Sequence, residues 1–484
     1  MRENMELPRG WIVKPLGDIV FYQKGKLPKS FSEESKDGFL SYVDINAFEN
    51  ASVRRYANVN NAVMTSENDV LVVWDGSRFG FSGIGVAGVL GSTLARVYSK
   101  VVDVKYLYYF LQSKYRFINS RPRGTGTPHV DPEVFWNLEF SIAPLNEQKR
   151  IVDKIETLFS DLEKGEALLK QVQQQLVVYR QSVLKAAVTG ELTREWREKN
   201  KHRLESVEAL LKRILKLRRD NWKGRGKYQE PVSLGHSYFQ LPDNWAIVEL
   251  DVIAQRITDG THQSPEFQKE GVPFVVIGDV RNGFIDWNKV SKWVSEEIYE
   301  DCTRRCRPEK GDILYTAVGS YGIALKVVDE KKFMFQRHIA HIKPTKGIAN
   351  LDYLLIVLNS PITLSHAHKV ARGVAQKTVT LGDLSHFHIP IPSEEEQEII
   401  VDRVNTAIAQ IDALEKWCST ELARSGMLRQ SILKAAFSGE LVPQDPEDEP
   451  ASELLARIQA ERASAEKDGN ARKTAGRRGR KAMA

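Results

Sequence analysis

A stretch of thirteen residues occurs twice in this chain, and this duplication restricts the possible folds more than any other feature. Residues 180–192 have the sequence RQSVLKAAVTGEL and residues 429–441 have RQSILKAAFSGEL, so ten of thirteen positions are identical at a separation of 249 residues. A repeat at this distance predicts two copies of one structural unit. Gly190 and Gly439 follow the last apolar residues of each stretch, which predicts a helix that ends in a left-handed glycine.

Apolar residues precede each copy at alternating spacings of three and four. In the first copy this 3.5-residue period extends over 33 residues, about 50 Å of helix, and it is typical of a coiled coil. We therefore predict long helices over residues 147–192, with Asn146 as N-cap, and over residues 394–441, the second starting at Ser393 or later. The predicted seam residues are Ile151, Ile155, Leu158, Leu162, Leu169, Val172, Leu176, Ile400, Val404, Ile411, Leu414, Leu428 and Ile432.

Two globular regions, residues 1–146 and 241–393, account for most of the remaining sequence. Both contain short alternating apolar runs between Gly and Asn turns, which predicts α+β domains rich in antiparallel strands. They share anchors in the same order, beginning with the LP-x-x-W pattern at residues 7–11 and 241–245, but their loops differ. This is typical of one scaffold that presents two binding faces, and drift after duplication is the alternative. In the first region we expect strands at Tyr42–Ile45 and Val70–Trp74 and a buried helix at Tyr106–Leu111.

Basic charge is concentrated in the linker, residues 193–240, and in the C-terminal tail, residues 442–484. Residues 194–227 carry a net charge of +8 and residues 467–484 a net charge of +6, against +6 for the whole chain. This distribution is compatible with contact to a polyanion, although a basic run is more commonly a solvated face or tail.

The linker also contains an amphipathic helical pattern at Val207–Leu217, with Leu210, Leu211 and Ile214 on one face. A similar pattern returns in the tail at Leu454–Ile458. One interpretation is that each pattern docks into a groove of a partner protein. The other is that each helix packs on its own chain, and the sequence leaves both open.

Composition and motifs exclude several classes of protein. Three cysteines in 484 residues do not form a disulfide framework, which favours a reducing cytoplasm, and no apolar run is long enough to cross a membrane. The chain has no phosphate-binding loop and no dinucleotide fingerprint. Cys302 and Cys306 could be combined with His338 and His341 as a zinc site, but this spacing is unusual and core or surface roles are favoured. We expect no catalytic residues and no metal site.

Several motifs resemble the specificity subunits of type I restriction–modification systems, a host-defence system that methylates and cleaves DNA. They are the two LP-x-x-W starts, the Pro-Leu-Asn-Glu-Gln sequence at residues 144–148 and the RQS-x-LKAA-x-x-GEL ends, and the resemblance extends from Leu7 to about Arg462. The second helix departs from the pattern, because residues 392–397 have an extra residue and lack the leucine.

The resemblance implies a non-catalytic, sequence-specific DNA-binding subunit of the cytoplasm. Residues 1–146 and 241–393 would be two target recognition domains, one for each half of a bipartite, asymmetric DNA sequence, and the long helices would form an antiparallel coiled coil. Partners would be double-stranded DNA, two modification (methyltransferase) subunits and restriction/translocase subunits, with no membrane. The chain would bind no cofactor itself, since S-adenosylmethionine would be bound by the modification subunits, and ATP and Mg by the restriction subunits.

Polar and glycine-rich loops are the candidates for DNA contact, because Arg, Lys and Gln can bind base edges, while amides, Ser, Thr and Lys bind phosphates. In the first domain these candidates are Gly76, Ser77, Arg78, Arg123, Gly124, Thr125, Thr127 and His129. In the second domain they are Gly319, Ser320, Tyr321, Gln336, Arg337, Arg372, Gly373, Gln376 and Lys377. Turn or surface roles compete at each position.

Two other classes of function remain possible from the sequence. A self-sufficient modifying enzyme would bind S-adenosylmethionine as the purified chain. A DNA-bridging coiled-coil protein without sequence preference would bind all duplexes with similar affinity at a fixed salt concentration.

Overall fold

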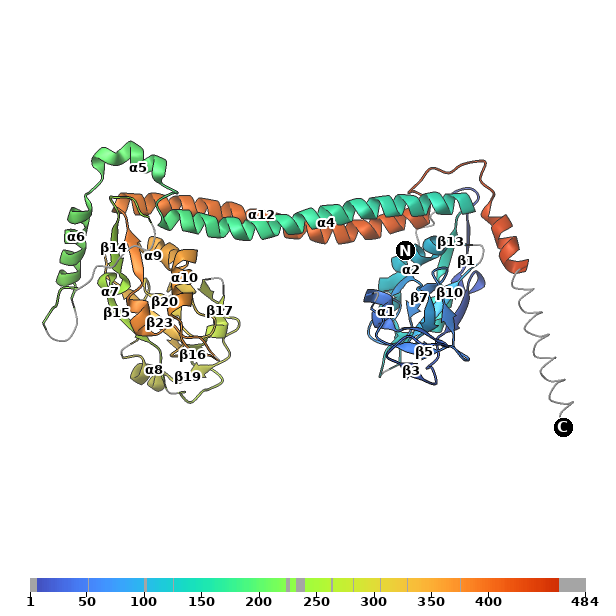
Figure 1. Cartoon of the computed structure of the whole chain (residues 1–484), viewed down its shortest axis with the longest axis horizontal. Coiled ribbons are helices and arrows are strands. Elements are labelled where there is room, and N and C mark those ends of the chain that lie inside the picture. Colours follow the sequence, from blue (N-terminus) through green and yellow to red (C-terminus); the bar gives the residue numbers. More distant parts are fainter. Residues whose placement is uncertain are drawn as a thin grey trace. The chain divides into compact units, whose positions relative to one another are not determined.

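A computed structural model of the chain describes residues 7–50, 52–99, 102–124, 126–222, 227–231, 240–262, 264–281, 283–304, 306–328, 330–374 and 376–460. The chain forms two compact units (Figure 1). The first comprises Met1–Leu169 with Ser419–Ala484, and the second comprises Lys170–Cys418. Each unit therefore combines one globular domain with the beginning of one long helix and the end of the other, instead of following the linear order of the predicted regions.

The first domain contains two main sheets, the two-stranded sheets β1-β13 and β11-β12, and a buried helix. One sheet has the strand order β2-β10-β7-β8 and the other β3-β5-β4-β9-β6, in which β4 and β9 are parallel. Its elements are β1 (Ile12–Pro15), η1 (Leu16–Asp18), β2 (Phe21–Lys24), β3 (Phe31–Ser32), β4 (Phe39–Val43), α1 (Ile45–Asn50), β5 (Tyr56–Asn58), β6 (Met64–Thr65), β7 (Val70–Val73), β8 (Ser82–Ile84), β9 (Gly88–Leu90), β10 (Leu94–Tyr98), α2 (Val104–Asn119), β11 (Pro122–Arg123), β12 (His129–Val130), α3 (Pro132–Trp136) and β13 (Glu139–Ile142).

The second domain repeats the central antiparallel sheet in the order β15-β23-β20-β21 and adds a sheet β19-β16-β22. Its elements, together with those of the linker, are α5 (Arg194–Asn200), η2 (Lys201–Arg203), α6 (Val207–Asp220), β14 (Ala246–Glu249), α7 (Leu250–Ile253), β15 (Ala254–Asp259), β16 (Val272–Val275), η3 (Ile277–Asp279), β17 (Val280–Arg281), β18 (Phe284–Ile285), β19 (Trp293–Val294), α8 (Glu296–Cys302), β20 (Ile313–Thr316), β21 (Ala324–Lys326), β22 (Met334–Phe335), β23 (Ile339–Pro344), α9 (Leu351–Leu358), α10 (Pro361–Val370), α11 (Leu381–Ser385) and β24 (His388–Ile391).

Local chemistry explains where these elements begin and end. The expected strand at Val70–Trp74 corresponds to β7, which ends one residue earlier at Val73. The expected buried helix lies inside α2, where the Asp103 carboxylate accepts hydrogen bonds from the first free backbone N–H groups. The expected strand at Tyr42–Ile45 was wrong in part. Strand β4 ends at Val43 because the Asp44 carboxylate accepts a hydrogen bond from the Ala47 N–H at 2.9 Å, which starts α1.

The long helices are α4 (Leu145–Val188) and α12 (Glu394–Ser438). Asn146 lies inside α4, so its prediction as the N-cap was wrong, whereas in α12 the Ser393 hydroxyl accepts from the Glu396 N–H at 3.3 Å. Gly190 and Gly439 have φ angles of 77° and 80°, so both adopt the predicted left-handed conformation just beyond the helix ends.

The coiled-coil seam differs from the prediction in one of its two rows. Leu414 and Leu428 are 47% and 46% exposed, so their assignment to the seam was wrong. The buried row of α12 repeats every seventh residue, at Val404, Ile411, Cys418, Ser425 and Ile432. The second row lies four residues after each of these, so Glu415 and Arg429 occupy positions next to the predicted leucines. In α4, Ile151, Ile155 and Leu176 are buried, while Leu158, Leu162, Leu169 and Val172 are half-buried.

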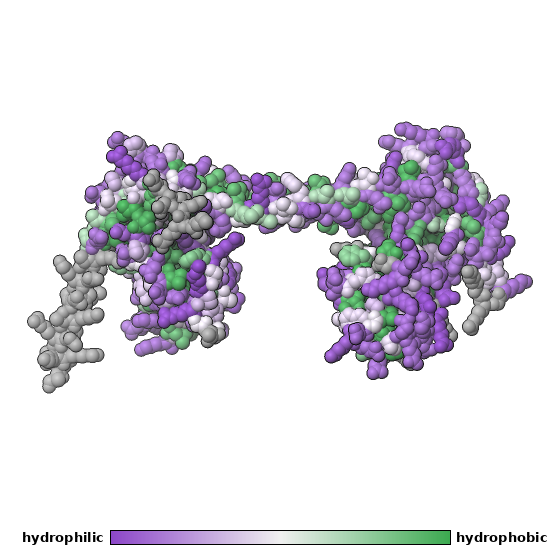
Figure 2. All heavy atoms as spheres, turned by 180° about the vertical axis from the view of Figure 1, so that it is seen from behind, coloured by the Kyte–Doolittle hydropathy of each residue, from purple (hydrophilic) through white to green (hydrophobic). Residues whose placement is uncertain are grey.

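Ion pairs between the helices explain this phase. In the first unit Arg429 of α12 pairs with Glu163 and Glu166 of α4, at 3.6 and 3.4 Å. In the second unit Arg180, which is equivalent to Arg429 in the repeat, pairs with Asp412 and Glu415. In each unit residue numbers rise along one helix as they fall along the other, so the coiled coil is antiparallel. Two positions of the second row are therefore charged, while Ile408 and Leu422 occupy others. Further apolar side chains lie exposed on the outside of the helices (Figure 2).

Candidate nucleic-acid interface

The motifs that repeat in the sequence form a structural junction in each unit. The indole N–H of Trp11 donates to the buried Glu147 carboxylate at 2.9 Å, and the indole N–H of Trp245 donates to the buried Glu396 carboxylate at 2.9 Å. Both carboxylates lie in the first turn of a long helix, so each tryptophan joins its domain to the helix that follows it. The LP-x-x-W pattern is therefore an anchor of the fold.

The GEL sequences complete these junctions. A Cβ atom on Gly190 would lie 2.5 Å from the Pro242 Cγ atom, and one on Gly439 would lie 2.2 Å from the Pro8 Cγ atom. Each long helix thus ends against the start of the domain in its own unit, at a distance that only glycine allows. These contacts within the chain account for the longest repeated motifs.

Candidate loops of the first domain are held together by backbone hydrogen bonds. The Gly76 N–H donates to the Pro128 carbonyl at 2.9 Å, and the Val130 N–H donates to the Trp74 carbonyl at 2.9 Å. The turn at Gly76–Arg78 therefore lies against the hairpin of β11 and β12. The candidate Thr125 lies outside the described residues.

The second domain makes the same arrangement. The Gly319 N–H donates to the Lys377 carbonyl at 2.9 Å, and the Val379 N–H donates to the Ala317 carbonyl at 2.9 Å. A third candidate loop is added because the Ala317 N–H donates to the carbonyl of His338, two residues after Gln336. Equivalent loops are therefore brought together in both domains.

Exposed donors cover these loops. Among the described residues the Arg123 guanidinium has no ion-pair partner, while Arg78 pairs with Glu49 and Arg372 lies 3.4 Å from Asp383. Lys377 is exposed, as is Arg337. Such side chains can bind phosphates or the acceptor atoms of bases.

Other candidates contribute to the shape of the loops. Gly124 and Gly373 have φ angles of 92° and 111°, which glycine adopts without strain. The Tyr321 hydroxyl lies 2.7 Å from the Nδ1 atom of His368, and the Gln336 side chain lies 2.7 Å from Nδ1 of His338. Of the remaining candidates, Ser77, Thr127, Ser320 and Gln376 are exposed at the loop surface and have no side-chain hydrogen bond among the described residues.

Two residues at the first loop surface were missed by the sequence prediction. The Asp75 carboxylate binds the Nδ1 atom of His129 at 2.7 Å and the ammonium group of Lys24 at 2.8 Å. Asp75 directly precedes the Gly-Ser turn and could have been noticed there. Lys24 lies 51 residues earlier and carries no local signal.

The structure does not bring Cys302, Cys306, His338 and His341 together as a zinc site. Among the described residues, no group of three or more His, Cys, Asp or Glu side chains could hold a metal ion. His341 instead binds the Asp312 carboxylate at 2.7 Å, and both residues are buried. The Cys306 thiol lies 3.8 Å from the Cys302 carbonyl, and burial raises the pKa of this thiol.

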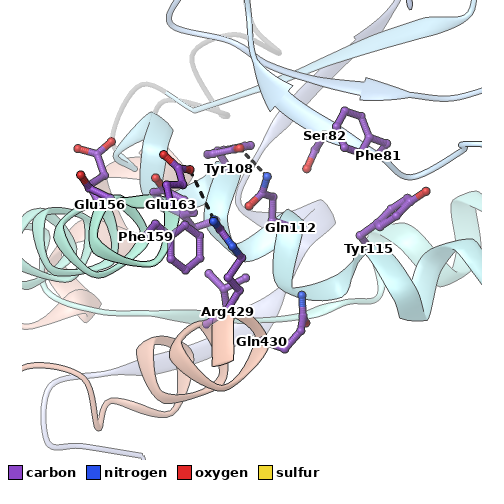
Figure 3. A pocket seen from close by; sticks show the side chains of 13 residues that line it. Phe81, Ser82, Tyr108, Gln112, Tyr115, Glu156, Phe159, Glu163, Arg429 and Gln430 are labelled. Atoms are coloured by element: carbon purple, nitrogen blue, oxygen red, sulfur yellow. Dashed lines mark hydrogen bonds and ion pairs between the residues drawn. The ribbon is translucent and has the colours of Figure 1, made fainter. Parts of the chain in front are cut away.

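A cavity of about 530 Å³ lies in the first unit between α2, α4 and α12 (Figure 3). Tyr108 and Tyr115 of α2 face Phe159 of α4 and Arg429 of α12 across it. The Arg429 guanidinium is already engaged by the carboxylates of α4. None of the predicted DNA-binding residues lines this cavity, so it is separate from the loop surface.

The two amphipathic patterns pack on their own chain. Leu210 and Ile214 of α6 are fully buried in the core of the second domain, and Leu454 and Ile458 are buried in the core of the first. Leu211 packs at the edge of the same core. The interpretation that these faces dock into a partner protein is therefore wrong for the buried leucines and isoleucines.

No helix within the described ranges combines the length and apolar character that a bilayer crossing requires.

The family model described as "Type I restriction modification DNA specificity domain" matches residues 8–174 and 242–423, once for each repeat.

Similar proteins agree with this match. The EcoBI specificity subunit of Escherichia coli is 32% identical over 371 residues, which cover 74% of this chain and 72% of that protein. The EcoKI specificity subunit of Escherichia coli K12 is 26% identical, with 95% of this chain and 97% of that protein covered. The HsdS subunit from Thermoanaerobacter tengcongensis shares the fold, with a TM-score of 0.55 at 19% identity and with 90% and 99% of the two chains covered. The chain therefore belongs to the family of type I restriction–modification DNA specificity subunits.

Proposed function

We propose that this chain recognises a bipartite, asymmetric DNA sequence, with one domain for each half, and that it catalyses no reaction itself. One observation carries this proposal: the same backbone contacts hold different side chains in the two domains. Arg78 and Thr127 of the first domain correspond to Tyr321 and Gln376 of the second, and all four side chains are exposed or partly exposed at the loop surface. A shared frame with different exposed groups is what two separate base sequences require.

Methylation belongs to partner subunits in this proposal. Adenine would be flipped out of the duplex and methylated by modification subunits that bind S-adenosylmethionine, and restriction subunits would use ATP and Mg. The loop surface of this chain would bind the two half-sites and thereby select the adenines. The absence of a phosphate loop and a dinucleotide fingerprint from the sequence supports this division of roles.

Exchange of one domain tests the proposal. Residues 8–143 would be replaced by the same domain of a related specificity subunit, and methylated adenines would be mapped after assembly with the modification subunits. We expect a change in one half of the target and none in the other. A change in both halves would contradict the modular arrangement, as would S-adenosylmethionine binding by the purified chain or equal affinity for all duplexes.

Two equivalent apolar surfaces on the long helices support the docking of two modification subunits. In the first unit Leu168 is 62% exposed and Met427 is 63% exposed. Their equivalents in the second unit, Trp417 and Val178, are 54% and 66% exposed. Exposed apolar groups on both members of a helix pair favour the addition of further helices. One such surface in each unit would accommodate one subunit.

Substitutions at these surfaces test the stoichiometry. Trp417→Asp and Leu168→Asp should each remove one modification subunit, which native mass spectrometry would detect as one subunit fewer per complex. Val328→Asp is the matched control, because Val328 is also exposed but lies outside the helices. Unchanged assembly in both helix variants would show that these surfaces do not bind the modification subunits.

A further inference from the structure

The Asp75 carboxylate joins three separate segments of the first domain at the loop surface. It follows β7, accepts from Lys24 at the end of β2, and lies 2.7 Å from the Nδ1 atom of His129 in β12. The Asp75 side chain is only 18% exposed, whereas those of Lys24 and His129 are 43% and 44% exposed. The acidic group is thus largely covered, and the two groups that it holds face solvent.

Backbone geometry fixes the position of His129 independently. Asp75 and His129 form an isolated antiparallel bridge, and Arg123 is the cross-strand partner of His129 in the hairpin. With Nδ1 engaged by Asp75, the Nε2 atom is the ring nitrogen that remains available to another molecule. A side chain held at both its backbone and one ring atom loses little conformational entropy when it binds.

The second domain keeps the bridge but lacks the cluster. Its equivalent pair is Val318 and Thr378, and Arg372 takes the place of Arg123 as the partner of the threonine. The fold therefore does not require an Asp–His pair at this site. The pair is a feature of the first domain alone, where it faces outward beside the Gly-Ser turn.

We propose that His129, positioned by Asp75, contacts one base pair of the half-site bound by the first domain through its Nε2 atom. Lys24, held by the same carboxylate, contacts a neighbouring phosphate. Asp75 is a positioning residue that itself touches no DNA. This inference rests on the proposed function and assigns specificity to one pair of residues within it.

The test uses the complete complex and a plasmid library in which each position of both half-sites is randomised. His129→Ala should reduce the methylation preference at one position of the first half-site about tenfold, within the range of a good base contact. Asp75→Ala should relax the same position. The double variant should lose no more methylation preference than His129→Ala alone, because Asp75 acts through the imidazole. A purely structural role of Asp75 would not give this non-additivity.

Two further variants complete the test. Lys24→Met should weaken binding to all sequences alike. It should also reduce the slope of log binding constant against log salt concentration by about one, the value for one lost phosphate contact. His202→Ala, at an exposed histidine of the linker, should leave the target unchanged. If Asp75→Ala does not fold, as judged by its melting temperature, Asp75→Val combined with Lys24→Met replaces it and should relax the same position, since valine stands at the equivalent position of the second domain.

An unchanged preference in folded His129→Ala, or relaxation spread over both half-sites, would overturn the inference. The proposed function would still hold in that case if exchange of residues 8–143 altered one half of the target. If the exchange altered neither half, the proposed function itself would fail.

Discussion

At the scale of single residues, the two junctions satisfy their buried carboxylates in different ways. Glu396 is fully buried and accepts from the Trp245 indole, the Thr193 hydroxyl and the Arg197 guanidinium, which lies at 2.8 Å. Glu147 accepts from the Trp11 indole and the Gln444 amide. The linker thus supplies a cation to the second junction, whereas the tail supplies a neutral donor to the first.

Removal of this cation should be costly. In Arg197→Met the buried Glu396 carboxylate loses its charged partner, and we expect a loss of about 3 kcal/mol in the free energy of opening at the start of α12. Amide hydrogen exchange in residues 394–400 measures this energy. Arg203→Met is the control, because Arg203 pairs with the neighbouring Glu395 at an exposed site and should change the energy by less than about 1 kcal/mol. Equal effects of the two substitutions would contradict this role of Arg197.

At the scale of elements, glycines have opposite roles inside and beyond the long helices. Gly190 has a positive φ and touches Pro242, so it is required for the end of α4 to pack. Gly165 and Gly426 lie inside the helices, and a Cβ atom added to either would have no neighbouring atom within 4 Å. The same residue type is therefore necessary at one place and dispensable at another.

Alanine substitutions should separate these roles. Gly165→Ala should raise the free energy of unfolding by about 1 kcal/mol, because alanine is the better helix former and meets no neighbour. Gly190→Ala should lower the free energy of unfolding by roughly 1 kcal/mol or more, because alanine is strained in the left-handed conformation and its Cβ atom would clash with Pro242. Thermal denaturation of the two variants, each compared with the unmodified chain, shows whether each substitution stabilises or destabilises the protein. Stabilisation by Gly190→Ala would show that the junction tolerates a Cβ atom.

At the scale of the whole molecule, the two long helices keep their phase more strictly than the domains do. Between Gln148 and Leu192, each residue has its equivalent 249 positions later in the chain. At the LP-x-x-W anchors this separation is 234 positions. One deleted residue would rotate the following seam by about 100°, so phase is under constraint in the helices and not in the loops. This is the behaviour expected if the helices set the distance between half-sites.

Lengthening both helices by one heptad tests this expectation. Seven residues inserted after Leu176, with a matched heptad after Ser425, add about 10 Å of helix, roughly three base pairs of duplex. We expect unchanged half-sites with a longer spacer between them, although rotation of the duplex can shift the preferred spacer by one base pair. Mapping of methylated adenines gives the spacer. A folded, active variant with the original spacer would contradict the role of the helices.

Strong local and repeated signals were sufficient for the architecture. The 249-residue repeat and the 3.5-residue period predicted two long helices, and the left-handed glycines at their ends are confirmed. The phase of the second seam row was not predictable in this way. Leu414 and Leu428 are apolar and correctly spaced, yet the ion pairs of Arg180 and Arg429 determine which neighbouring position faces the partner helix.

For the candidate site, composition identified the loops but not their chemistry. Gly76 and His129 were chosen from separate stretches, and only the backbone contacts of the folded domain bring them together. Lys24 and Asp75 could not be paired from the sequence, because their contact depends on the strand order of the sheet. The sequence by itself determined the repeat, the helices and the family resemblance, since periodicity and duplication are properties of residue order. The tertiary structure alone decided which side chains meet, because such contacts depend on distances between segments that are remote in the chain.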